Sequence, residues 1–550
     1  MRSELVRIYK VVHTWTGILS GMALFIAFYA GAITLFKQPL VHWATPPASA
    51  SAIPLAQTPT LIQRTLASHP EATRSFELDV RGDAAHALEW TRHEPHADEH
   101  DALSVRHFMA TLEADGTVRS REVPRSHLGE LIDVLHRVVG LPVDSDANRY
   151  LMGVVASLYF MALFSGFVVL LPSMLKDLFA FRVGPNLKRM WLDAHNIVGL
   201  GSFPFHVVIA LTATVFAFHD AIYAAQDMLV HDGKLGALLR GDAAPPEKQP
   251  LDPAKLLAPD QLVARITAVA PDLELTTLRY MRVTGPSPTV FAFGHNPRAL
   301  EFRALGGVIM IDPYSGRIQN TAYVPGQQGV PETVLTSAFA LHFGSFGGAP
   351  VKWLYFVLGL LGAWLVYSGN LLWIESRGRK LKPHVAGGAL PEQRRGVRLM
   401  AAATVGVCLG AVCGISLTIV CAKWLHGHVG DLNAWHRGVY YAAFFAAIAW
   451  SFLRGGARAA VELLRVAAGL TMAIPLTSLV AALAPSLGMW THTEPAALAV
   501  DGIASIIAFG LLRVARATAK RVYEGRLDSV WSAPRATSSE APDAATQAMP

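Results

Sequence analysis

The chain has 550 residues, of which 52% are hydrophobic and 16% charged, with a mean hydropathy of +0.34. Soluble chains carry about a quarter charged residues, so this composition excludes an ordinary soluble protein and favours one that crosses a membrane several times. The net charge of +6 does not indicate a nucleic-acid partner, because the basic residues lie between apolar segments, where they orient a membrane protein. We expect membrane lipid as a partner, and no nucleic acid.

Eight apolar segments are long enough to cross a bilayer as helices. They lie near residues 11–36, 149–172, 191–219, 351–374, 398–424, 434–453, 459–484 and 496–515. Basic clusters around Arg7, Arg182, Arg377, Arg458 and Arg516 fall on one side if the chain crosses eight times. Because Lys and Arg are retained on the cytoplasmic side, this pattern places both termini in the cytoplasm.

Two long polar segments, about 40–135 and 220–341, fall on the outer side of this topology. Each opens with a helical pattern, Pro59–Ser68 in the first and Asp260–Val269 in the second, and continues as short stretches of alternating polarity typical of strands. Each closes with a turn and a strand, at Asp115–Val118 and Asp312–Ile318. The segments predict two small α+β domains, between the first and second spans and between the third and fourth.

Four histidines occupy matched places in the apolar part of the chain. His13 and His195 lie near the cytoplasmic ends of their spans, and His136 and His342 lie at the outer ends of theirs. An ionisable side chain at membrane depth is costly and marks a functional site, and paired imidazoles are axial ligands of haem iron. The chain lacks a Cys-x-x-Cys-His sequence, so a covalently attached haem is not expected. We expect two haems b, one held by His13 and His195 and one by His136 and His342.

The same features recur in order, which indicates an internal duplication. The first repeat has His13-x-x-x-Gly17, an outer segment, His136 and a span ending in Ser165-Gly166; the second has His195-x-x-x-Gly199, an outer segment, His342 and a span ending in Ser368-Gly369. Residues four apart share a helix face, so Gly17 and Gly199 would leave a flat surface on which a porphyrin can lie. The alternative for each histidine is a small-residue helix contact at which a neighbour satisfies the imidazole.

His206 is a further candidate ligand. It lies eleven residues after His195, which is about 16 Å along a straight helix and within about 20° of the same face. Two haems stacked across a membrane would have this relation, so His206 would replace His136 or His342 at the outer haem. An equally good explanation is a mid-span histidine bonded to a carbonyl freed by a kink at Pro204.

The duplicated His-x-x-x-Gly span, outer segment and Leu-His element, over about residues 5–380, resemble the PepSY-associated transmembrane family. The members of this family include haem-containing siderophore reductases of the bacterial inner membrane. The resemblance implies a four-helix core, PepSY-type domains in the periplasm, and haem b that passes electrons to a ferric siderophore. Reduction would release the iron, because hard oxygen ligands favour the more highly charged Fe(III) over Fe(II). The four spans after Arg394 lie outside the core of that family.

The electron donor must come from elsewhere, because no Gly-x-Gly-x-x-Gly sequence follows a strand and opens a helix. A quinol and a cytoplasmic reductase are the two options. A function of a different class also remains, namely a non-enzymatic membrane module whose outer domains bind peptides or regulate a partner protein. In that case the histidines would serve helix packing.

Two further groups of side chains have candidate roles. A dense run of imidazoles and carboxylates that includes His93, His96 and His100 would bind a divalent metal or released iron, although such a run is more often a solvated loop. Arg137 and Arg149 are placed to meet haem propionates on the outer side. Ordinary anchoring at the membrane interface is the alternative for both arginines.

The first apolar segment is longer than the core of a signal peptide and contains His13, so we expect it to be retained as a span. The expected fold is an all-α polytopic membrane protein of about eight transmembrane helices, with two periplasmic α+β PepSY-like domains. Its parts are a first span in 1–39, a PepSY-like domain in 40–135, two spans in 136–219, a second PepSY-like domain in 220–341, a fourth span in 342–380, a cytoplasmic linker in 381–397, a four-helix extension in 398–520 and a disordered tail in 521–550.

Overall fold

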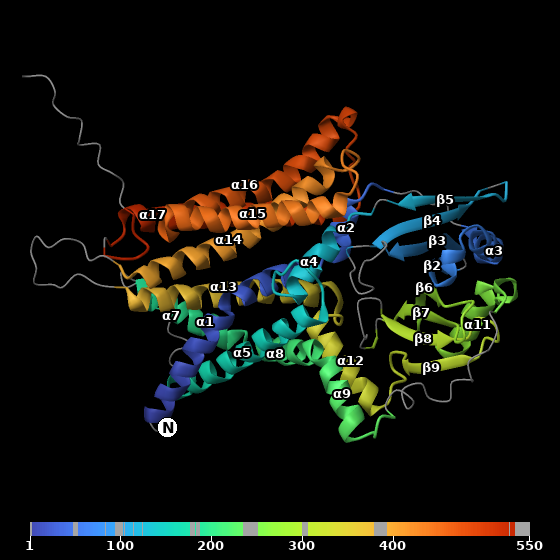
Figure 1. The fold of residues 1–550 in the computed structure, drawn as a ribbon, viewed down its shortest axis with the longest axis horizontal. Helices are drawn as coiled ribbons and strands as arrows, with labels where there is room; N and C mark the ends of the chain where they lie inside the picture. Colours follow the sequence, from blue (N-terminus) through green and yellow to red (C-terminus); the bar gives the residue numbers. More distant parts are fainter. Residues whose placement is uncertain are drawn as a thin grey trace, which may run out of the picture. The chain divides into compact units, whose positions relative to one another are not determined.

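The computed structural model describes residues 3–47, 53–82, 84–93, 103, 105–113, 115–123, 125–175, 182, 187–234, 251–296, 298–299, 306–378, 393–526 and 528–533. The chain forms two compact units. The first comprises Met1–Ala180 and Asn196–Leu365, and the second comprises Phe181–His195 and Val366–Pro550. Figure 1 shows the helices and strands in chain order by colour.

Six helices are long and apolar enough to cross a membrane. They are α1 (Ser3–Thr34), α5 (Asp146–Leu170), α13 (Gly348–Arg377), α14 (Arg395–Trp424), α16 (Gly456–Leu483) and α17 (Pro495–Glu524). Two further helices, α7 (Leu187–Gly201) and α8 (Phe203–Ala217), pass the same test only as a pair bent by 67°. The expected eight spans are therefore not confirmed, since the described residues contain six, or seven if the bent pair is one span.

The remaining predicted span, 434–453, forms the helix α15 (Leu432–Arg454). The carboxylate of Asp431 caps this helix by accepting hydrogen bonds from the backbone N–H groups of Asn433 and Ala434, both at 2.9 Å. Its 23 residues are enough to cross a bilayer. Polar side chains in its first half, such as those of His436 and Arg437, reduce its mean hydropathy. For this reason α15 is not one of the six helices that are apolar enough to cross a membrane.

The helical part of the first unit is built around α1, which packs against α5 and against α4 (Leu128–Arg137). The helix α5 in turn packs against α8, and α8 packs against α12 (Val330–Phe343). Two short helices complete this part, α2 (Lys37–Ala44), which packs on α4, and α9 (His219–Leu229), which follows α8. The amphipathic helix α4 buries apolar side chains and carries His136 and Arg137 in its last turn.

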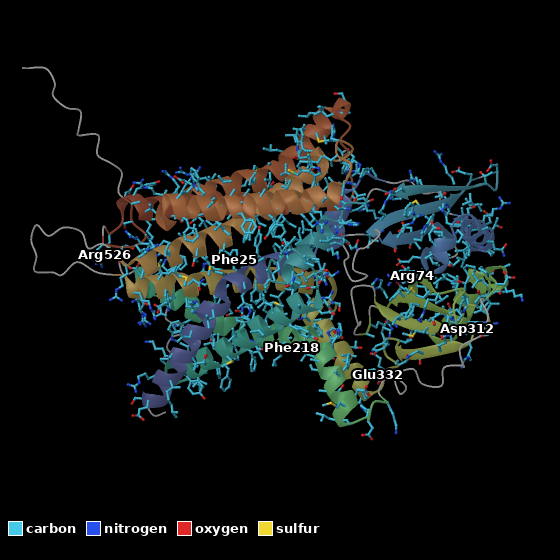
Figure 2. All side chains as sticks on the ribbon, viewed as in Figure 1. Phe25, Arg74, Phe218, Asp312, Glu332 and Arg526 are labelled. Carbon is cyan, nitrogen blue, oxygen red and sulfur yellow. The ribbon has the colours of Figure 1, made fainter. Side chains whose placement is uncertain are left out.

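Close packing of α5 on α8 depends on a glycine. Figure 2 labels Phe25 and Phe218 in the helical part of the first unit. The ring of Phe218 stacks on Tyr150 with centroids 5.9 Å apart, and a Cβ atom at Gly153 would lie 2.6 Å from that ring. A larger residue at position 153 would therefore displace the ring of Phe218, which follows α8.

The strands of both outer segments form a single nine-stranded sheet. Its order is β5 (Val118–Val123), β4 (Val105–Leu112), β3 (Ala84–His93), β2 (Ser75–Arg81), β6 (Glu274–Met281), β7 (Thr289–His295), β8 (Gly307–Ile311) and β9 (Ile318–Tyr323), and the short β1 (Ile53–Pro54) pairs with β3. All of these pairings are antiparallel. Each segment supplies part of one shared sheet, a joining that the expectation of two small α+β domains did not include, and the bounds of the two domains stay a prediction.

The two segments meet at β2 and β6, which occupy equivalent places in the two repeats. Phe76 lies opposite Tyr280, and Leu78 lies opposite Leu278. The carboxylate of Glu77 accepts a hydrogen bond of 2.6 Å from Arg279 across the same strand pair. Antiparallel pairing of equivalent strands gives the two repeats a pseudo-twofold relation, as an isologous interface between two copies would.

The helices predicted at the start of each outer segment are confirmed as α3 (Thr58–Ser68) and α11 (Pro259–Val269). Their buried side chains, such as Leu61 and Ile266, belong to one apolar core with strand residues of both segments. The predicted turn at Asp312 is confirmed as well, since its carboxylate accepts hydrogen bonds from the N–H groups of Tyr314 and Ser315. Asp312 and Arg74 mark this part of the molecule in Figure 2.

In the second unit α14 packs against α15 and α16, and α16 packs against α17. Three glycines spaced by four residues allow α14 to approach α15 closely. A Cβ atom at Gly406 would lie 2.9 Å from the Cα atom of Ile448, and one at Gly414 would lie 2.8 Å from the ring of Tyr440.

The folded part of the second unit extends beyond position 521, where we expected a disordered tail to begin, because Trp531 is buried against these helices. Positions 534–550 and most of the expected linker lie outside the described residues.

Candidate functional site

Two short helices of the first unit hold the outer pair of histidines. His136 lies in the last turn of α4, and His342 lies in the last turn of α12. The helix α12 ends at Gly344, whose φ of +61° is the left-handed conformation common after helices. The hydroxyl of Tyr355 donates a hydrogen bond of 2.7 Å to the carbonyl of Leu341. This contact fixes the last turn of α12 and with it the position of His342.

The structure brings His136 and His342 together. Their ring centroids are 6.4 Å apart and their planes are inclined by 39°. The Nδ1 atom of His136 lies 2.8 Å from the carbonyl oxygen of Ala27 in α1, and the Nδ1 atom of His342 lies 2.7 Å from the hydroxyl oxygen of Thr212 in α8. Each imidazole is therefore oriented by a different helix of the first unit.

The ring of His136 packs on a glycine of α1. A Cβ atom at Gly31 would lie 2.7 Å from Nδ1 and 2.8 Å from Cε1 of His136. Separations this short are not tolerated between a Cβ and a neighbouring ring, so only glycine fits without displacing the imidazole. The sequence did not identify Gly31 as part of the site, because the equivalent position in the second repeat is Ala213 and the glycine therefore does not recur.

Burial keeps both of these imidazoles neutral. His136 and His342 lie in α4 and α12, and neither of these helices is among the six candidate membrane spans. Burial lowers the pKa of His136, although a hydrogen bond to Ala27 opposes this change. Burial, together with the neighbouring His136, lowers the pKa of His342 to about 3. Neutral imidazole is the form that binds a metal ion.

The rings of His13 and His195 each lie beside the glycine of the Ser-Gly pair in the next span of the same repeat. The Nδ1 atom of His13 lies 2.8 Å from the carbonyl oxygen of Ala162 in α5, and a Cβ atom at Gly166 would lie 2.8 Å from its ring. The Nδ1 atom of His195 lies 3.0 Å from the hydroxyl of Ser368 in α13, and a Cβ atom at Gly369 would lie 3.4 Å from its ring. The recurrence of Ser-Gly in the two repeats was the sequence pattern that pointed to these positions beside His13 and His195.

The glycines of the two His-x-x-x-Gly sequences do not contact these rings. Nothing lies within 4 Å of the position that a Cβ atom would take at Gly17, and at Gly199 such an atom would lie 3.5 Å from Leu365. The open space beside Gly17 is compatible with a flat ligand, whereas Leu365 lies beside Gly199, and a role of either glycine beside a haem stays a prediction. His13 belongs to the first unit and His195 to the second, so their pairing stays a prediction too.

His206 is fully buried in an aromatic environment. Its ring makes edge contacts with Phe28, Tyr159 and Phe205 at centroid distances of 5.5, 6.1 and 5.1 Å. Within the described part of the chain, neither ring nitrogen has a hydrogen-bond partner, and the hydroxyl of Tyr159 has none either. The explanation that a freed carbonyl satisfies His206 is therefore wrong. Because α7 and α8 are bent by 67°, the expected relation of His206 to His195 along a straight helix is wrong as well.

Arg137 and Arg149 converge on one buried carboxylate. Asp144 accepts a hydrogen bond of 2.6 Å from Arg137 and one of 2.9 Å from Arg149, and its side chain is fully buried. A buried carboxylate needs such partners. These arginines therefore fix the connection between α4 and α5 next to His136.

A similar arrangement precedes His195 in the second unit. The carboxylate of Asp193 forms ion pairs with Arg182 at 3.0 Å and with Arg189 at 3.1 Å. Asp193 is also buried. His136 and His195 therefore each lie close in sequence to a buried aspartate that binds two arginines.

The proposed metal-binding run in the first outer segment is only partly described. His93 is the last residue of β3, whereas His96 and His100 lie outside the described residues. Among the residues that are described, no group of three or more His, Cys, Asp or Glu side chains could hold a metal ion. Because most of this run lies outside the described residues, metal binding by it stays a prediction.

The family described as the PepSY-associated TM region matches residues 11–376. This range includes all four matched histidines and every strand of the sheet, and it ends before α14. No curated protein matches the chain. Because the family match covers about two thirds of the 550 residues, this multi-pass membrane protein belongs to the PepSY-associated TM-region family.

Proposed function

We propose that the chain is a b-type haem protein of the bacterial inner membrane that passes electrons outward to the Fe(III) of a periplasmic siderophore. Membership of the PepSY-associated family supports this proposal, and the arrangement of the matched histidines supports it independently. The single observation that carries it is the pair His136 and His342. Both termini would then lie in the cytoplasm, and the shared sheet in the periplasm.

The separation of His136 and His342 fits one metal ion between them. Two imidazoles that bind the same ion at about 2 Å each have ring centroids about 6 Å apart. The observed distance is 6.4 Å. Because the two rings come from α4 and α12, which belong to different repeats, a haem held by both histidines would join the two repeats.

Hydrogen bonds also fix which nitrogen of each ring carries the proton. A carbonyl oxygen can only accept, so His136 donates its Nδ1–H to Ala27. The hydroxyl of Thr212 already donates to the carbonyl of Val208 at 2.6 Å, so it accepts from Nδ1–H of His342. In both neutral rings Nε2 then carries the lone pair. An outer partner that fixes the tautomer in this way is typical of histidine ligands.

The inner histidine of the first repeat follows the same pattern. His13 donates Nδ1–H to the carbonyl of Ala162, which leaves the lone pair on its Nε2 atom. His195 bonds through the same nitrogen to Ser368. We propose that His13 and His195 bind a second haem, with Gly17 and Gly199 beside it. His206 remains an alternative ligand, because a fully buried imidazole without a partner is costly unless a ligand satisfies it.

Haem b supplies one-electron transfer when it is bound. The chain itself holds the imidazoles neutral, in one tautomer and in fixed orientations. Reduction of the acceptor would release its iron, because hard oxygen ligands hold Fe(III) more tightly than Fe(II). A quinol or a cytoplasmic reductase would supply the electrons, and the surrounding lipid would complete the environment of the spans.

A visible absorption spectrum of the full-length protein, purified after haem-supplemented expression, tests the proposal. We expect a Soret band of b-type haem that shifts on addition of dithionite and again on addition of a ferric siderophore. His136→Ala and His342→Ala should each remove one haem equivalent per chain. His219→Ala, which changes an exposed histidine of α9, should retain both equivalents.

Three different results would contradict three different parts of the proposal: the haem, its ligands and the electron acceptor. If the wild-type protein has no Soret band, the haem proposal is wrong, and a non-enzymatic module that binds peptides or regulates a partner becomes the better explanation. If haem is present and His136→Ala retains it, the ligand assignment is wrong. If the reduced protein is not reoxidised by any ferric siderophore, the acceptor is wrong while the haem assignment holds.

A further inference from the structure

A short helix of the first unit has an apolar face that the rest of the described chain does not bury. None of the residues of α9 is buried, and the side chains of Met228 and Leu229 are 73% and 75% exposed. Proteins in water rarely expose large apolar side chains together unless a partner covers them. This face of α9 therefore indicates a partner outside the described residues.

The sequence of α9 separates apolar from polar side chains. The apolar residues recur at helical spacing, at Ala221, Ile222, Ala225, Met228 and Leu229. With 3.6 residues per turn, these side chains fall within about 120° of the helix circumference. Polar side chains fill the opposite side, at His219, Asp220, Gln226 and Asp227. This pattern is typical of a helix that lies between an apolar phase and water.

The helix begins at the end of a candidate span. Phe218 alone separates α9 from α8, which forms a candidate span together with α7. The ring of Phe218 stacks on Tyr150, near the start of α5, another candidate span. The end of one span beside the start of another marks the level where a bilayer ends, and aromatic rings are enriched at that level. Figure 1 shows α9 turning away from the direction of α8 at this point.

A second exposed apolar stripe lies on α12, which packs against the same end of α8. The rings of Phe216 in α8 and Phe339 in α12 have centroids 4.5 Å apart. On α12 the side chains of Val330, Val334 and Leu341 share one face, and all three are exposed. Two helices at the same end of α8 therefore present apolar side chains that the described chain leaves exposed.

The position of this surface favours membrane lipid as the partner. Leu211 and Val215 in α8 are exposed as well, and apolar side chains on the outside of a span meet lipid. The exposed apolar surface therefore continues from the span onto α9. A protein partner would instead cover a patch enclosed by a polar rim. The carboxylates of Asp220 and Asp227 lie on the opposite side of α9, where they can meet water while the apolar face meets acyl chains.

We propose that α9 and the exposed stripe of α12 lie on the membrane surface, with Ile222, Met228 and Leu229 among the upper acyl chains. Helices of this kind bury their apolar face about 5–10 Å into the boundary between headgroups and acyl chains. Because α9 precedes β6 and α12 follows β9, lipid contact would attach the second half of the sheet to the membrane at both of its ends. The attachment does not depend on the proposed haem function.

Spin labelling of the full-length protein in vesicles of phosphatidylcholine and phosphatidylglycerol tests this position of α9. The native cysteines are first replaced by alanine, at Cys408, Cys413 and Cys421, and one new cysteine then carries a nitroxide. At Met228→Cys and Leu229→Cys we expect more collisions with oxygen, which dissolves in acyl chains, than with a water-soluble nickel chelate. Gln226→Cys, on the opposite face of the same helix, is the matched control and should show the reverse ratio.

Two reference positions calibrate the ratio and show that the labelled protein is folded. Leu211→Cys, in the candidate span, should favour oxygen. Ser287→Cys, at an exposed position between β6 and β7, should favour the chelate. Val334→Cys measures the stripe of α12 separately and should behave as Met228→Cys does.

Three results would overturn the proposal, and each names a different environment of the apolar face. If Met228→Cys and Leu229→Cys favour the chelate as Gln226→Cys does, the face lies in water. If nitroxides at these two positions collide with neither reagent, protein covers the face. If their spectra show spin–spin broadening that disappears when labelled protein is diluted with unlabelled protein before reconstitution, a second copy of the chain covers it.

Discussion

The ring of Phe76 in β2 stacks on the ring of Tyr280 in β6, with centroids 4.4 Å apart and planes inclined by 9°. Both side chains are fully buried, and the two residues lie opposite each other in the strand pair that joins the two outer segments. The two halves of the sheet therefore cannot separate without exposing both rings to water. This contact makes the sheet one cooperative unit.

Replacement of Phe76 by alanine should destabilise both halves of the sheet together. Loss of a fully buried phenylalanine costs about 3–5 kcal/mol. We expect faster hydrogen exchange in peptides from β2 and from β6 of the full-length protein, measured by mass spectrometry. Val118→Ala, at the edge strand β5, should change only its own neighbourhood. Faster exchange in β2 with unchanged exchange in β6 would show that the two halves unfold independently.

The local elements of this sheet were predictable from the sequence, and their joining was not. Alternating polarity identified strands near Arg74–Val80 and Leu275–Val283, because a half-buried strand requires that pattern. The pairing of Phe76 with Tyr280 links positions about 200 residues apart, and no local pattern specifies which strand edges meet. The duplication made a pseudo-twofold arrangement possible without indicating that the repeats share a sheet.

Alanine at Gly31 or at Gly166 should disturb a histidine, whereas alanine at Gly201 should not. The added Cβ atom would lie 2.7 Å from His136 in the first case and 2.8 Å from His13 in the second, and nothing lies within 4 Å at Gly201. We expect the first two variants to melt several degrees below the wild type in haem-free form and to hold less haem. Melting of detergent-solubilised protein and the ratio of haem to protein measure the two effects.

Gly17→Ala separates two explanations of the His-x-x-x-Gly sequence. The space beside Gly17 is open, and alanine is a better helix former than glycine, so alanine there should not lower the melting temperature of haem-free protein and should raise it slightly. If a porphyrin lies on this surface, the same variant should lower haem content. Loss of stability without haem would instead mean that Gly17 serves helix packing.

Replacement of His206 by leucine should stabilise the haem-free protein. Both ring nitrogens of His206 are buried, and no described residue bonds to them, and leaving a buried polar group unsatisfied costs about 1–3 kcal/mol. Leucine removes that cost and fits the apolar contacts of Phe28 and Phe205. The control His219→Leu changes an exposed side chain. A lower melting temperature for His206→Leu would contradict the prediction, and loss of a haem equivalent would identify His206 as a ligand.

Sequence reasoning found the histidines of the candidate site but not the groups that orient them. The duplicated register identified His13, His136, His195 and His342, because repetition singles out positions even where each residue alone is ambiguous. The partners of His13 and His136 are backbone carbonyls, which any residue type can provide. The sequence also left the break between α7 and α8 open, because Pro204 permits both a straight continuation and a bend.

Acidification should destabilise the sheet through His107 in β4. Burial, with smaller contributions from His127 and Arg125, lowers the pKa of His107 to about 3, whereas the unfolded chain has a pKa near 6.5. Above pH 6.5 the His107 side chain is neutral in both the folded and the unfolded state, so the free energy of unfolding does not depend on its protonation. Below it the unfolded state binds a proton that the folded state does not, so stability falls as the pH decreases from about 7 toward 3.

The difference between wild type and His107→Gln isolates this effect from the protonation of carboxylates. Between pH 7 and pH 5 the wild type should lose about 2 kcal/mol more stability in β4 than the variant does. Hydrogen exchange of β4 peptides in the full-length protein, corrected for the intrinsic pH dependence of exchange, measures that loss. His295→Gln in β7 serves as the control and should keep the wild-type pH dependence of β4. Equal slopes for wild type and His107→Gln would mean that His107 is protonated in the folded sheet, against the effect expected from its burial.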